Sequence, residues 1–182
     1  MKYIIILTAL LLFCGNLAWA SQFSPALTQS SARVDSSPRT LFLQHIPSIA
    51  EQFIGIPFKL GGRPRRTGTT DNSSLFYAIY SIASQKAGLT YKAYLPMKYL
   101  LENTHQVEAS DVQNGDLIVL DNDLAAMVFQ VDPSGRLYFI YASEKRQQVI
   151  SFHSENLVFQ AYWLENLRGF FRLKEGMLLP SH

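Results

Sequence analysis

The chain has 182 residues, of which 48% are hydrophobic, 13% aromatic and 16% charged. This length suits one domain with its own core, and the low charge combined with many aromatic residues excludes global disorder. Removal of the leader described below leaves 15 basic and 14 acidic residues. That near-balance gives no electrostatic basis for nucleic-acid binding.

The first twenty residues contain the three parts of a secretory signal peptide. Lys2 gives a positive start, residues 4–13 are an almost unbroken apolar run, and Ala18-Trp19-Ala20 ends in small residues suited to cleavage. The apolar run is shorter than the roughly 20 residues that a membrane span needs. We therefore predict a signal peptide at residues 1–20, cleavage after Ala20, and a periplasmic or secreted mature chain without a membrane span.

Cys14 is the only cysteine, and it lies inside the predicted leader. The bulky Phe13 ahead of it disfavours the alternative of a lipid anchor on Cys14, because lipidation needs a small residue there. The mature chain then has no thiol. Its histidines are scattered without the spacing of metal ligands, and no glycine-rich phosphate loop is present. Neither a metal nor a cofactor is expected.

The chain after the leader divides into a linker and a domain. Residues 21–42 are rich in Ser, Thr and Gln and predict a flexible linker, followed by a domain over residues 43–175. Pro47 suits the first turn of a short helix that ends at Phe53. An extended piece from Gly55 to Gly62 and a polar loop to Thr70 follow.

The period of the apolar residues changes within the domain. Residues 71–86 predict a buried helix that begins at capping residues and stops at Gly88, and Pro96–Asn103 predicts a second, short helix. Strands are then expected at residues 117–120, 124–131, 136–142, 147–152 and 169–173, with a further segment at 158–163. Helices followed by antiparallel strands predict an α+β fold.

Three fragments of the domain together match a known pattern. They are Gly-x-Pro-Phe-x-x-Gly-Gly at residues 55–62, Asp71-Asn72-Ser73-Ser74-Leu75 at the helix start, and Asn-Gly-Asp-Leu at residues 114–117. In this order, from Ile49 to Leu173, the chain resembles the NlpC/P60 family of papain-like cell-wall peptidases. The resemblance implies N-terminal helices packed on an antiparallel β-sheet or half-barrel.

The residues that the family uses for catalysis are absent at the matching positions. The family's nucleophile is the cysteine of an Asp-Cys-Ser sequence, and its position falls on Asn72, an amide that no base can activate. The base histidine corresponds to Leu124, with Ala125 or Ala126 as alternatives. The orienting residue corresponds to Tyr141. The resemblance therefore implies a degenerate catalytic triad.

Other residues of the pattern suggest binding. Asp71 and Ser73 match the family positions that receive the free amine of the substrate peptide, although both are also good helix caps. Phe58 replaces a tyrosine that the family tends to carry after the proline. Arg63 leads a basic cluster that is either a solvated loop or an anion-facing rim. We take Asp71, Ser73, Phe58 and Arg63 as candidate binding residues.

Three hypotheses of function follow. The first is an exported, non-catalytic domain that binds a peptidoglycan stem peptide or an envelope protein in the degenerate cleft. The alternative is a peptidoglycan endopeptidase or amidase with a displaced nucleophile, Ser73 or Ser74, and His105 or His153 as its base. The third is a structural or interaction protein whose aromatic second half fills the sheet core.

Overall fold

The computed structural model describes residues 37–181. The predicted signal peptide, Cys14 and most of the predicted linker lie outside these residues. The helices are α1 (Pro38–Ala50), α2 (Pro64–Thr67), α3 (Asn72–Lys86) and α4 (Met97–Glu102), with short turns η1 (Glu51–Phe53), η2 (Ala109–Asp111), η3 (Phe159–Trp163, π-helical) and η4 (Glu175–Met177). None of these helices is long and apolar enough to cross a membrane.

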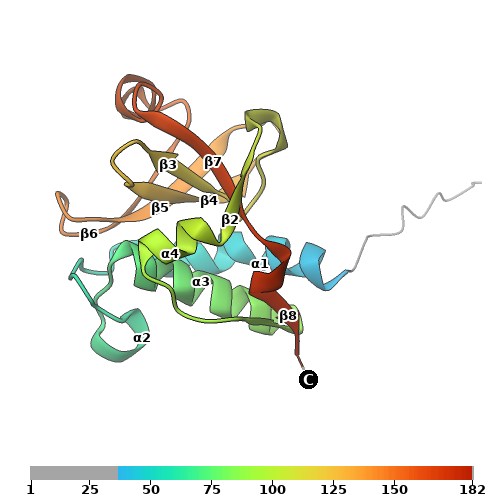
Figure 1. Ribbon diagram of the computed structural model, residues 1–182. Coiled ribbons are helices and arrows are strands. Elements are labelled where there is room, and N and C mark those ends of the chain that lie inside the picture. Colours follow the sequence, from blue (N-terminus) through green and yellow to red (C-terminus); the bar gives the residue numbers. More distant parts are fainter. Residues whose placement is uncertain (1–36, 182) are drawn as a thin grey trace, which may run out of the picture. The chain divides into compact units, whose positions relative to one another are not determined.

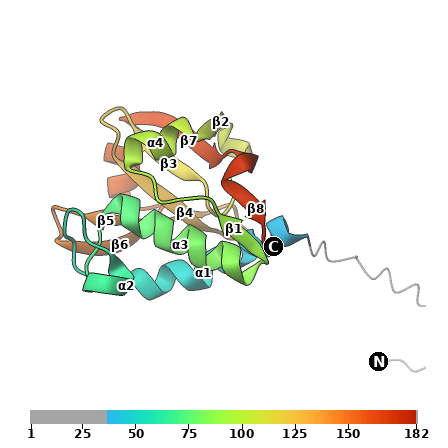
Figure 2. The same cartoon turned by 60° about the horizontal axis from the view of Figure 1, so that its bottom comes forward.

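The strands form two antiparallel sheets. They are β1 (Leu89–Tyr91), β2 (Thr104–Val107), β3 (Leu117–Leu120), β4 (Ala125–Val131), β5 (Leu137–Ser143), β6 (Gln148–His153), β7 (Leu167–Leu173) and β8 (Leu178–Pro180). The main sheet has the order β2-β7-β3-β4-β5-β6 (Figure 1), and β1 pairs with β8 (both labelled in Figure 2). The α+β class predicted from the sequence is confirmed.

Both faces of the main sheet are buried. Ala125 and Met127 of β4 face the core shared with the helices, whereas Ala126 and Val128 between them face a second core, as the two-residue period of a strand requires. Helices α1 and α3 cover the first face (Figures 1 and 2). Phe159 and Trp163 of η3 cover the second.

The first helix begins earlier than predicted. Helix α1 begins at Pro38 because the Ser37 hydroxyl caps it by accepting a hydrogen bond from the Thr40 N–H. The helix start expected near Pro47 is therefore wrong, and α1 begins within the residues expected to form the linker. Pro47 lies inside the helix and cannot donate to the carbonyl of Leu43. The Asn114 side chain donates to that carbonyl at 3.2 Å instead.

The Asn-Gly-Asp motif joins the helices to the sheet. Gly115 has φ +87°, and a Cβ there would lie 2.6 Å from Cδ1 of Ile46. The Gly115 carbonyl accepts a hydrogen bond of 2.7 Å from the buried Tyr80 hydroxyl. Asp116 is 1% exposed and accepts two hydrogen bonds from Arg172 of β7, at 2.9 and 2.8 Å. The positive φ of Gly115 and the lack of space for a Cβ atom beside Ile46 together require glycine at residue 115.

Several elements differ from the sequence-based expectations. The polar loop of residues 63–70 contains α2, and residues 158–163 include a π-helical turn. Strands β1, β2 and β8 were not predicted because they are short and rely on distant partners. Strand β8 also continues the fold beyond the expected domain end at residue 175.

Candidate functional site

The extended Gly-x-Pro-Phe segment adds to the free edge of the main sheet. The Gly55 N–H donates to the Val149 carbonyl at 2.9 Å, and the Phe58 N–H donates to the Gln147 carbonyl at 2.9 Å. This pairing along β6 covers the sheet edge. It brings Phe58 beside the start of α3, where Phe58 also bridges to Thr70.

Asp71 is the N-cap of α3 and uses both carboxylate oxygens locally. Its Oδ1 accepts from the Ser74 N–H at 2.8 Å, and its Oδ2 accepts from the Gly61 N–H at 2.8 Å. The carboxylate therefore satisfies a free N–H of the helix start and fixes the preceding loop. This supports the capping interpretation of Asp71 while leaving it half-buried at the edge of a groove.

Asn72 bridges two strands with its side-chain amide. Its Nδ2 donates to the Ala125 carbonyl at 3.1 Å, and its Oδ1 accepts from the Ala142 N–H at 2.7 Å. The register of β4 and β5 ends at Met127↔Ile140. Continued by two residues along each strand, that register would set Ala125 opposite Ala142. The Asn72 amide thus takes the place of the next rung of the ladder.

An open groove lies beside the start of α3. Its volume is about 970 Å³. The residues that line it come from the start of α3, the loop before it, the start of α4, the β3–β4 turn, β5, the β5–β6 turn, β6 and the segment that ends in η3. They include Phe58, Leu60, Asp71, Asn72, Ser73, Met97, Asp123, Leu124, Tyr141, Lys145, Arg146, Phe152, Tyr162 and Trp163. The groove is large enough for a peptide segment or a small ligand.

The structure brings most of the predicted site residues to this groove. Asn72, Leu124 and Tyr141 all line it. The alternatives Ala125 and Ala126 are fully buried in the two cores instead, so Leu124 is the one of the three that faces the groove. The Tyr141 ring packs edge-on against Trp163 at a centroid distance of 5.5 Å.

None of the histidines that the structure describes lines the groove. His105 lies on β2, at the far edge of the sheet, and His153 ends β6 beside Tyr138. Ser73 lines the groove without such a base, whereas Ser74 is 5% exposed and lines a different pocket. A displaced serine nucleophile therefore has no imidazole within reach in this part of the chain.

Arg63 is not at the groove. It precedes α2 and lines a second, smaller pocket on the outer side of α3, together with Pro64, Arg65 and Arg66 of α2. The loop that joins Phe58 to Asp71 turns away from the groove after Gly61, which has φ +71°. The family motif suggested Phe58 and the basic cluster suggested Arg63 as binding residues, and the structure sets these two residues at different sites.

The groove also contains residues that the sequence did not indicate as a site. Lys145 and Arg146 lie in the β5–β6 turn, and no motif indicated them. Tyr162 and Trp163 were expected to fill the core; Trp163 does so, at 2% exposed, but Tyr162 is 43% exposed. One aromatic run thus serves both the core and the groove wall.

Comparison with known proteins identifies the fold. No protein-family model matches the sequence, and no curated protein is significantly similar to it. Among solved structures, an NLP/P60-family protein similar to a lipoprotein from Staphylococcus aureus has a TM-score of 0.52 at 21% identity, over 72% of this chain and 41% of that chain. An NlpC/P60-family protein from Bacillus cereus has a TM-score of 0.52 at 18% identity, over 72% of this chain and 40% of that chain.

These similarities show an NlpC/P60-like fold, as the sequence motifs predicted. The chain spans about two fifths of the length of both structures. At this level of identity the similarity establishes the architecture alone, since one fold supports many functions. The function must therefore be argued from the groove.

Proposed function

We propose that this protein is an exported, non-catalytic NlpC/P60-like domain that binds a peptide in its groove, either a peptidoglycan stem peptide or a segment of an envelope protein. The observation that carries the proposal is the role of Asn72. Asn72, which the sequence motif aligns with the family's nucleophile, is an amide that holds two strands together and lines an open groove.

The lining of the groove supports a peptide ligand. Tyr162 offers a partly exposed aromatic wall, and aromatic side chains supply large contact area at low entropic cost. The lining includes two acidic side chains, Asp71 and Glu144, and two basic ones, Lys145 and Arg146. Groups of both charges suit a ligand that carries both an amine and a carboxylate.

Export is part of the proposal and rests on residues 1–20. The charged start, the apolar run and the Ala18-Trp19-Ala20 site support it. N-terminal sequencing of the protein recovered from its host should begin at Ser21. An N-terminus at Met1 or at Cys14 would contradict cleavage by the general signal peptidase.

Calorimetric titration with muropeptide stem peptides tests the binding. We expect saturable heat, and about tenfold weaker binding for Tyr162→Ala, which removes the exposed part of the groove wall. The matched control is Tyr99→Ala, because Tyr99 is 52% exposed on α4 and does not line the groove. Absence of heat with every stem peptide would refute stem-peptide binding and leave an envelope protein as the proposed ligand, whereas equal loss in both variants would refute the groove as the binding site.

A further inference from the structure

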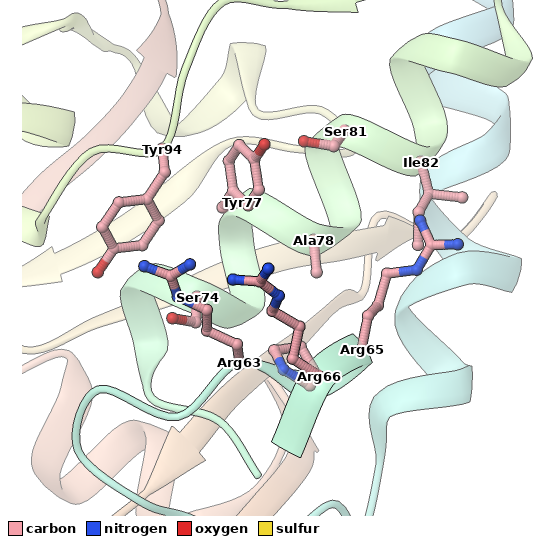
Figure 3. A pocket seen from close by; sticks show the side chains of 10 residues that line it. Arg63, Arg65, Arg66, Ser74, Tyr77, Ala78, Ser81, Ile82 and Tyr94 are labelled. Atoms are coloured by element: carbon pink, nitrogen blue, oxygen red, sulfur yellow. The ribbon is translucent and has the colours of Figure 1, made fainter. Parts of the chain in front are cut away.

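A second pocket lies on the outer side of α3. It has a volume of about 310 Å³ and shares no lining residue with the groove. Residues of α2 form one wall, and residues of α3 and the segment after β1 form the other (Figure 3). The lining includes Arg63, Arg65, Arg66, Tyr77, Ala78 and Tyr94.

The charge of this pocket is unbalanced. Three arginines line it, and its lining contains no acidic side chain. Within residues 37–181, the salt bridges involve other arginines, at Arg136, Arg168 and Arg172. Three guanidinium groups that share one hollow repel each other, and an anion between them would relieve that repulsion.

The backbone that carries the arginines is fixed in advance. The Thr67 hydroxyl accepts from the Arg63 N–H and donates to the Arg63 carbonyl, both at 3.0 Å. Gly62 packs so closely on Thr69 that a Cβ there would lie 2.6 Å from the Thr69 hydroxyl oxygen. A fixed turn of this kind lowers the entropic cost of closing the arginines around a ligand.

The remaining lining is aromatic and apolar. Tyr77 and Tyr94 meet edge to face at a centroid distance of 5.7 Å and are 38% and 41% exposed. The guanidinium groups of Arg63 and Arg66 lie toward these two rings, whereas that of Arg65 lies beside Ile82 (Figure 3). The pocket therefore has a cationic side and a ring-binding side.

We propose that this pocket binds a small phosphomonoester with a compact ring or apolar body. Arg63 and Arg66 hold the phosphate, because guanidinium groups match its oxygens in pairs, and Tyr77 and Tyr94 contact the body. A dianion suits the two arginines better than a single carboxylate does. The volume is at the lower end of the range for small-molecule sites and therefore suits a compact ligand.

Titration of the purified protein with phenyl phosphate tests the site. Inorganic phosphate and phenol serve as probes of the two halves, and benzoate tests the choice of anion. We expect phenyl phosphate to bind at least tenfold more tightly than inorganic phosphate or benzoate, with affinity that falls as salt rises. Equal binding of benzoate, or no binding of phenyl phosphate at millimolar concentration, would overturn the assignment.

Variants locate the site. Arg63→Ala and Arg66→Ala each should weaken phenyl phosphate at least tenfold while leaving the melting temperature unchanged, since both side chains are exposed. Lys86→Ala is the matched control: it removes the same charge from an exposed position of α3 outside the pocket. Equal effects of all three variants would show general charge screening and refute the pocket.

Vesicles distinguish a free ligand from a lipid headgroup. Binding to vesicles that contain phosphatidic acid, lost in Arg63→Ala and absent with phosphatidylcholine, would place the same phosphomonoester on a lipid. Binding of phenyl phosphate without vesicle binding would indicate a soluble ligand. Equal binding to vesicles of phosphatidic acid and of phosphatidylcholine, which is a phosphodiester, would contradict recognition of a phosphomonoester.

Discussion

Replacement of Asn72 by alanine tests the bridge between β4 and β5. The change removes the hydrogen bonds to Ala125 and Ala142, whose backbone groups lie in residues that are 0% and 4% exposed. Each of the two lost hydrogen bonds, together with the buried backbone group that it leaves without a partner, costs about 1–2 kcal/mol. We therefore expect a loss of about 2–4 kcal/mol in the free energy of unfolding. That loss corresponds to a decrease of about 6–12 °C in melting temperature.

Denaturant unfolding followed by tryptophan fluorescence measures this loss. Ser73→Ala is the control, because Ser73 is the next residue of the same helix start and lines the same groove; it should change stability by less than about 0.5 kcal/mol. Asn72→Asp keeps the acceptor but sets a carboxylate against the Ala125 carbonyl, so it should be at least as destabilising at neutral pH. Stability within about 0.5 kcal/mol of the parent for Asn72→Ala would refute the bridging role.

Three further predictions concern the fold that supports the site. Arg172→Met should cost about 3 kcal/mol in chemical unfolding, since it leaves the buried Asp116 carboxylate without its cation; restoration by Asp116→Asn in the same chain would confirm the cause. Burial raises the pKa of Tyr80 well above its usual value; the unfolded chain therefore ionises first, and stability should fall as the pH rises above about 10, less steeply in Tyr80→Phe. Gly115→Ala should cost at least about 2 kcal/mol, because of its positive φ and the filled space at Cβ; an unchanged melting temperature would contradict this packing.

Features of the fold that depend on neighbouring residues could be predicted from the sequence. The start of α3 at Asp71-Asn72 and the hairpin turn at residues 132–135 follow from local capping and turn chemistry. The position of β7 between β2 and β3 could not be predicted, because it depends on pairing between segments about 50 residues or more apart. The start of α1 at Pro38 could not be predicted, because proline usually favours the first turn of a helix. Pro47 is tolerated inside α1 because Asn114 donates to the carbonyl of Leu43.

In the candidate site, too, local sequence predicts some features, whereas others depend on contacts between distant segments. The motif alone indicated that Asn72 lacks nucleophilic chemistry, but its bridging role requires the strand register, which sets Ala125 opposite Ala142. The sequence analysis named both Arg63 and Phe58 as binding residues, but they line different pockets. Residues close in sequence can thus belong to different sites when a loop reverses direction.

Mass spectrometry of peptidoglycan incubated with the purified protein tests the absence of hydrolysis most directly. Because the sequence motif aligns the amide Asn72 with the nucleophile of the family and no described histidine lines the groove, we predict that stem peptides remain intact over prolonged incubation while the same preparation binds them. Release of cleaved stem peptides, abolished by Ser73→Ala, would contradict a non-catalytic groove and establish a hydrolase with a displaced nucleophile.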